Sequence, residues 1–96
     1  MHPPRIVDNA KLIAYLVLTD SNIRTGNTRH IVGGSLIKNF YGLAICQYEN
    51  DKGFYLFYCD SSWKTITDTH HETIEDAKDQ AEFEYTNIEN NWVFLE

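Results

Sequence analysis

The chain has 96 residues, of which 43% are hydrophobic and 14% aromatic, which is enough for one domain with its own core. No apolar run approaches the roughly 18 residues that a membrane helix needs. The net charge of -6 disfavours binding to nucleic acid, whose phosphates repel carboxylates. Residues 1–10 lack the hydrophobic centre of a secretory signal, so we expect a cytoplasmic protein.

The chain begins with an expected extended arm over residues 1–10, which contain Pro3-Pro4. Segments rich in β-branched and aromatic residues follow, and each is bounded by turn-forming residues. They predict strands at residues 11–19, 41–49, 54–59 and 63–69. The polar residues 20–30 are expected to form a hairpin loop or the ragged ends of two strands. Gly33-Gly34 predicts a bend or bulge, since no Lys-Ser/Thr pair follows to make a phosphate loop.

A helix is predicted over residues 73–88, because Ile74, Ala77, Ala81, Tyr85 and Ile88 recur at the spacing of one helical face. The two alanines let the helix backbone approach a sheet closely. Thr73, three residues before Asp76, predicts the N-cap, and Asn87 or Asn90 can end the helix in a left-handed conformation. A short strand at residues 92–95 closes the chain. The predicted fold is therefore α+β: a two-layer antiparallel sheet, a meander of about four strands plus a C-terminal strand, with one helix packed across it.

Charge is distributed unevenly along the sequence. Residues 1–64 carry a net +2, whereas residues 65–96 carry -8, with Lys78 as the sole Lys or Arg in that last third of the chain. On the helix, Phe83 is expected to project away from the alanine face into a field of acidic side chains. We therefore predict a partner-binding surface that contains Glu75, Asp76, Asp79, Glu82 and Phe83. In a second interpretation, Phe83 is covered by the N-terminal arm or by another subunit, and the carboxylates are simply solvated.

An alternative partner-binding surface is the polar loop that contains Arg24, Asn27 and Arg29.

Reactive sites are not expected. Cys46 and Cys59 fall among apolar strand residues with no neighbouring base, so we predict buried free thiols. With the hairpin turning at Asp51-Lys52, Cys46 would face Phe57 and Cys59 would face Ala44. Adjacent histidines, His70-His71, point to opposite faces of a strand and are poorly placed to share a metal ion. We expect no enzyme activity, cofactor or metal.

The stretches YGLAICQYEN and GFYLFYCDSSWKTITDTHHETIEDAKDQAEFEY, which span residues 41–85, resemble small bacterial immunity proteins of polymorphic or contact-dependent toxin systems. The shared pattern is an aromatic strand, an Asp-x-x-Trp turn, a strand ending in Asp-Thr, and an acidic helix. The resemblance implies a non-enzymatic inhibitor that binds its cognate toxin, often a basic nuclease. The other hypothesis that the sequence supports is a homodimeric structural or small-ligand-binding domain. It is motivated by the aromatic strand at residues 54–59, which has more large side chains than one helix needs to cover.

Overall fold

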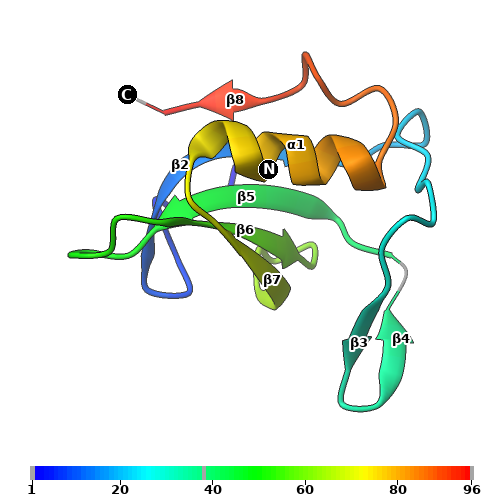
Figure 1. Cartoon of the computed structure of the whole chain (residues 1–96), viewed down its shortest axis with the longest axis horizontal. Coiled ribbons are helices and arrows are strands. Elements are labelled where there is room, and N and C mark those ends of the chain that lie inside the picture. Colours follow the sequence, from blue (N-terminus) through cyan, green and yellow to red (C-terminus); the bar gives the residue numbers. More distant parts are fainter. Residues whose placement is uncertain (1, 38, 96) are drawn as a thin grey trace.

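A computed structural model describes residues 2–37 and 39–95, so Met1 of the expected arm and Glu96 of the acidic block lie outside it. It contains one helix and an antiparallel sheet, which confirms the predicted α+β class (Figure 1). No helix among these residues is long and apolar enough to cross a membrane. The elements in chain order are β1 (Ile6–Val7), β2 (Ala10–Val17), β3 (His30–Val32), β4 (Ser35–Ile37), β5 (Gly42–Gln47), β6 (Phe54–Cys59), β7 (Thr65–His71), α1 (Ile74–Glu84) and β8 (Val93–Phe94).

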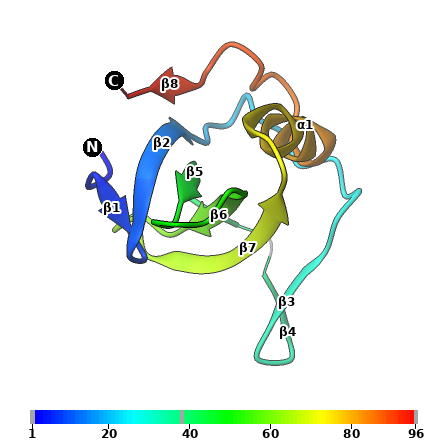
Figure 2. The same cartoon turned by 60° about the vertical axis from the view of Figure 1, so that its left-hand side comes forward.

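The main sheet has the strand order β1-β2-β5-β6-β7, and β8 also pairs with β2. The four long strands predicted from sequence therefore pair consecutively, and the sheet curves so that β2 and β7 bend around β5 and β6 (Figure 2). The two short strands β1 and β8 lie one after the other along the outer side of β2, pairing with its beginning and its middle. The C-terminal strand thus returns to the β2 side of the sheet, a choice that its sequence left open.

The N-terminal arm was predicted to be extended, and its second half forms a strand that pairs with β2. Asp8 and Asn9 adopt left-handed backbone conformations, with φ of 50° and 66°, and they turn Ile6–Val7 back onto β2. Asp and Asn tolerate this conformation better than other residues with side chains, so a two-residue hairpin forms without glycine. Val7 becomes buried as a result.

Both faces of the sheet are packed, and this accounts for the aromatic residues of β6. Leu56 and Tyr58 pack beneath α1 in one apolar cluster. Phe57 and Cys59 point to the opposite face, where they join a second cluster with Trp63. Alternation of side chains along the strand separates the two sets. Packing against both faces within one chain therefore buries Leu56, Phe57 and Tyr58 and partly covers Phe54 and Tyr55.

The turn between β5 and β6 is centred one residue earlier than predicted. Cys46 pairs with Tyr55 and Ile45 with Leu56, so the hairpin is centred between Asn50 and Asp51. Asn50 takes a left-handed φ of 66°, and Asp51 N donates to Tyr48 O at 3.1 Å. A shift of one residue at the turn moves every cross-strand partner by two. Cys46 consequently faces Tyr55, not Phe57, and Cys59 faces Gly42, not Ala44.

Gly33-Gly34 forms a hairpin turn, which corrects the predicted bend or bulge within a strand. Both glycines have positive φ, 59° and 83°, as a tight two-residue turn requires, and they join β3 to β4. The β3–β4 hairpin is a separate two-stranded sheet that projects from the rest of the molecule (Figure 1). Residues 20–30 were predicted as a hairpin loop or strand ends, but residues 20–29 form part of the long connection from β2 to this hairpin, and His30 begins β3.

The helix begins as predicted but ends earlier. Thr73 is the N-cap, and its Oγ1 accepts a hydrogen bond from Asp76 N at 3.0 Å. The helix ends at Glu84, not Ile88, because Tyr85 turns to an extended conformation with φ of -136°. Tyr85 then forms an isolated antiparallel bridge with Arg24. Ala77 and Ala81 are fully buried against the sheet, and Tyr85 and Ile88 complete the same cluster from beyond the helix end.

Candidate functional site

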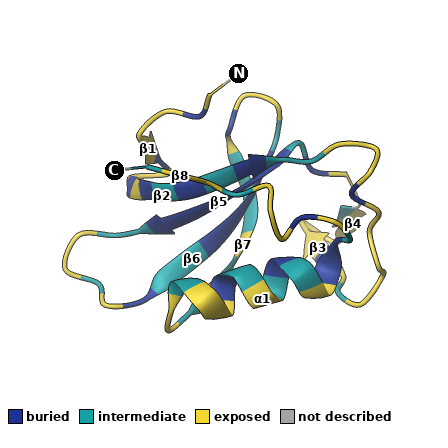
Figure 3. Ribbon diagram, turned by 90° about the horizontal axis from the view of Figure 1, so that it is seen from above, coloured by how far each residue is buried: buried dark blue, intermediate teal, exposed yellow. Residues whose placement is uncertain are grey.

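The acidic residues that the sequence predicts lie on the outer side of α1. Figure 3 shows exposed and half-buried stretches alternating with buried ones along this helix. Glu75, Asp76 and Asp79 are exposed, and Glu82 is half-buried. Phe83 is 53% exposed, a high value for an aromatic side chain in a chain with two well-packed clusters. The helical periodicity explains this arrangement, because the buried alanines fix the opposite side of the helix against the sheet. The predicted acidic surface is therefore one continuous side of the helix.

Lys78 does little to neutralise this surface. Its Nζ lies 3.9 Å from Glu75 and 5.7 Å from the ring centre of Phe94 on β8. The Glu75 side chain is 77% exposed, so this ion pair is weak and screened by solvent. The acidic surface consequently keeps most of its negative charge available to an incoming cation.

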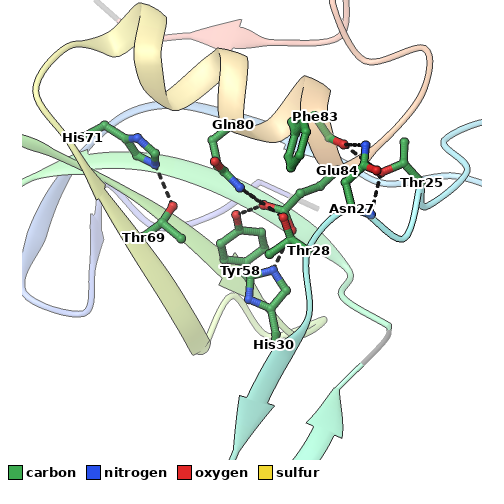
Figure 4. A network of polar contacts seen from close by, with 10 residues as sticks. All are labelled: Thr25, Asn27, Thr28, His30, Tyr58, Thr69, His71, Gln80, Phe83 and Glu84. Carbon is green, nitrogen blue, oxygen red and sulfur yellow. Dashed lines mark hydrogen bonds and ion pairs between the residues drawn. The ribbon is translucent and has the colours of Figure 1, made fainter.

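The loop between β2 and β3 is tied to the C-terminal end of the helix (Figure 4). The Thr25 hydroxyl and the Asn27 amide both donate to the carbonyl oxygen of Phe83, at 2.7 and 2.9 Å. Thr25 N also donates to Glu84 O at 2.8 Å. These bonds satisfy carbonyls that the end of a helix leaves unpaired. The loop thereby supplies the C-terminal cap that the helix lacks in its own sequence.

This cap changes how the second predicted surface, the loop with Arg24, Asn27 and Arg29, is interpreted. Asn27 has a structural role at the helix end, whereas Arg24 and Arg29 are exposed on the same loop. The two surfaces that the sequence offered as alternatives adjoin each other at Phe83. A partner that covers Phe83 would therefore meet carboxylates along the helix and arginines from the loop.

A buried polar network lies directly beneath, and the sequence analysis missed it. Glu84 is only 3% exposed. One of its carboxylate oxygens accepts from Tyr58 Oη and from Gln80 Nε2, the latter at 2.9 Å, and the other lies 2.6 Å from His30 Nε2 (Figure 4). A carboxylate only accepts, so His30 Nε2 carries the hydrogen. Burial is the main cause that raises the pKa of Tyr58, and its hydrogen bond to Glu84 adds to the effect.

The network attaches the β3–β4 hairpin to the body of the molecule. His30, the first residue of β3, is buried between the rings of Tyr58 and Phe40, with ring centres 4.2 and 5.3 Å away. A signal for Glu84 was present in the sequence, because it lies three residues after Ala81 and seven after Ala77. Those spacings place it on the buried side of the helix, where a carboxylate requires donors.

The two cysteines and the adjacent histidines, the other candidate reactive residues, show little reactivity. Burial raises the pKa of both Cys46 and Cys59 to about 12, so both remain protonated thiols near neutral pH, and both are free, as predicted. His70 packs against the ring of Tyr55, whereas His71 bonds Thr69 Oγ1 at 2.7 Å. Across residues 2–37 and 39–95, no three His, Cys, Asp or Glu side chains group in a way that could hold a metal ion.

An open pocket of about 350 Å³ lies beside the helix cap, at the rim of the sheet. Arg24, Asp20, Asn39, Phe40 and Tyr85 line it. The pocket opens next to the loop whose Thr25 and Asn27 bond the Phe83 carbonyl. It is shallow and polar, unlike the enclosed apolar pockets in which small molecules are usually held.

No protein-family model, curated protein or solved structure matches this chain.

Proposed function

We propose that this protein is a non-enzymatic protein-binding module that neutralises a basic toxin domain, in the manner of a bacterial immunity protein. Its contact surface consists of Glu75, Asp76, Asp79, Glu82 and Phe83 on α1. A cytoplasmic location follows from the proposal, because a neutraliser of this kind protects the cell that makes it.

The observation that supports the proposal most directly is Phe83, half-exposed within an acidic field and held in place from below. Aromatic residues contribute disproportionately to interface energy when a partner covers them. The loop bonds at the Phe83 carbonyl and the buried Glu84 next to it fix its position before binding. Because little ordering remains to be done on association, the entropic cost of binding is low.

The charge distribution supports a basic partner and fast association. Carboxylates on one side of a helix attract cations over a distance of about 10 Å at 0.1 M salt. Such steering raises association rates well above those of uncharged surfaces. An inhibitor that must reach its toxin before the toxin acts gains directly from this property.

The experiment is a binding titration between the purified protein and the product of the gene immediately upstream, at low and high salt. We expect tight binding that weakens as salt is added. The combined variant Asp79→Lys, Glu82→Lys and Phe83→Ala should lower the affinity at least a hundredfold, since it removes an aromatic anchor and reverses two charges.

A matched control compares two single charge reversals, Asp79→Lys on the helix and Glu49→Lys in the turn after β5, a position remote from the helix in sequence. Glu49→Lys should leave the affinity within a few-fold of the parent, whereas Asp79→Lys should lower it more. Equal effects of these two single variants would show that only net charge matters. Unchanged affinity in the combined helix variant would refute this surface as the binding site.

The homodimer remains the second candidate, and the observation that favours it is the hairpin. Ile31 and Leu36 are 66% and 43% exposed and lie directly opposite each other on β3 and β4. Sedimentation at micromolar concentration separates the two functions. A monomer would remove the dimer, and a dimer that dissociates in the Ile31→Glu variant would favour it.

A further inference from the structure

The two outer edges of the main sheet differ in whether another strand pairs with them. Along β2, the outer side is occupied by β1 and then by β8. At the other end of the strand order, β7 pairs with β6 on one side only. In the described part of the chain no strand pairs with the outer side of β7, although β3 lies near it. Figure 2 shows β7 as the free margin of the curved sheet.

An unpaired strand edge presents a row of backbone N–H and C=O groups to any extended segment. β7 runs for seven residues, Thr65–His71, which is longer than a typical strand in a globular protein. It contains no proline and no lysine, the residues with which edge strands are often protected. The edge is therefore open to strand addition.

The side chains of β7 disfavour pairing with a second copy of the same strand. Two-fold antiparallel pairing of Thr65–His71 would place the central residue, Asp68, directly opposite its own copy. Like charges directly opposite each other in a sheet are destabilising. Asp68 is exposed, so it is free to meet the side chain of a different incoming strand.

Negative charge continues from this edge into the proposed contact surface. Asp68 is followed by Glu72 in the turn and by Glu75 and Asp76 in the first turn of α1. No Lys or Arg occurs between residues 65 and 77. An incoming strand would therefore find a favourable charge opposite Asp68 and beyond it if it carried Lys or Arg.

We propose that the outer edge of β7 accepts an extended strand from the partner, with a basic residue opposite Asp68. The inference rests on the proposed function, since it names how the same basic partner is held. Backbone bonds along β7 supply affinity and the pairing at Asp68 supplies specificity, as in other cases of strand addition. The alternation in β7 gives the added strand two different faces to contact. Asp68 and His70 lie on the face of Tyr55, whereas Thr67 and Thr69 lie on the helix side.

The test uses the full chain labelled with nitrogen-15 and a capped heptapeptide, Thr-Val-Thr-Lys-Thr-Val-Thr. Amide shifts and slowed hydrogen exchange should concentrate in Thr65–His71. A peptide with Glu in place of its Lys should bind about threefold to tenfold more weakly, the range expected when a cross-strand pair changes from opposite to like charge. A peptide N-methylated at alternate positions on its pairing side should not bind.

Two variants give the matched comparison. Asp68→Lys should reverse the preference between the Lys and Glu peptides, whereas Glu89→Lys, at an exposed position beyond the end of the helix, should leave both affinities within twofold. Absence of peptide binding, or shifts centred outside β7, would overturn the inference. Toxin binding that depends on Phe83 would still stand in that case, so the two proposals fail separately. Conversely, peptide binding at β7 with no binding of the upstream gene product would retain the edge and remove the proposed partner.

Discussion

Glu84→Ala is the substitution from which we expect the largest loss of stability among the charged residues. The carboxylate accepts hydrogen bonds from Tyr58, Gln80 and His30, and it is almost fully buried. Alanine leaves these donors without their shared acceptor inside the apolar cluster beneath α1. It also removes the bond that attaches the first residue of β3 to the body.

The expected cost is about 3–5 kcal/mol, because breaking a buried hydrogen-bond network is among the changes that destabilise a protein most. Most of this cost comes from the unsatisfied Tyr58 hydroxyl and from His30, because a buried donor without an acceptor costs about 1–3 kcal/mol. Glu84→Gln should cost less, about 1–2 kcal/mol, since its carbonyl oxygen still accepts from one donor. A domain of this size is stable by about 5–15 kcal/mol, so Glu84→Gln should still fold and measures the loss even where Glu84→Ala leaves little stability.

Urea unfolding measures the free energies, and hydrogen exchange reports on the hairpin. We expect a lower midpoint with an unchanged slope, together with faster exchange at His30–Val32. Glu75→Ala is the control, because its side chain is 77% exposed and its removal should change stability by less than about 0.5 kcal/mol. A loss below about 1 kcal/mol for Glu84→Ala, or unchanged exchange in β3, would refute the assignment of Glu84 as the attachment point of the hairpin.

Two further predictions concern packing and pH. Gly42→Ala should lower the free energy of unfolding by about 1–3 kcal/mol, measured by thermal or urea unfolding. The reason is that a Cβ at this position would overlap the ring of Trp63 and lie 3.0 Å from Leu16 O. A neutral result would mean that the ring moves aside. Burial, with a smaller contribution from Glu84, raises the pKa of Tyr85 to about 12 from its ordinary value of 10.0, so the folded state keeps a proton that the unfolded state loses. Stability should therefore fall as pH rises from 10 towards 12, and Tyr85→Phe should reduce that slope; an identical slope in the variant would contradict the assignment.

Much of the fold could be predicted because its signals are local. Thr73 caps the helix through a bond to Asp76, three residues away, and β6 has the bounds predicted for it, residues 54–59. Turn positions were predicted less accurately. The turn at Asn50-Asp51 differs from the predicted one by a single residue, yet this changes every cross-strand partner in the β5–β6 hairpin. The reason is that the backbone conformation of the turn, in which Asn50 is left-handed, sets the register of both strands.

The candidate site was likewise predicted in part, where its signals are local in the sequence. Phe83 and the carboxylates around it were predicted, because a helical period and two alanines determine which side of α1 is exposed. The sequence could not bring the Arg24 loop to Phe83. That contact depends on hydrogen bonds between residues more than fifty positions apart, from Thr25 and Asn27 to the end of the helix.

The sequence by itself determined the α+β class, most strands, the helix start and the acidic surface, all through periodicity and capping within a few residues. Only the tertiary structure decided that β1 and β8 cover one edge of the sheet while β7 stays open. It also decided that Glu84, chemically equal to its solvated neighbours, is buried against Tyr58 and His30. The physical reason is that pairing of strand edges and satisfaction of buried charge depend on distant segments meeting in space.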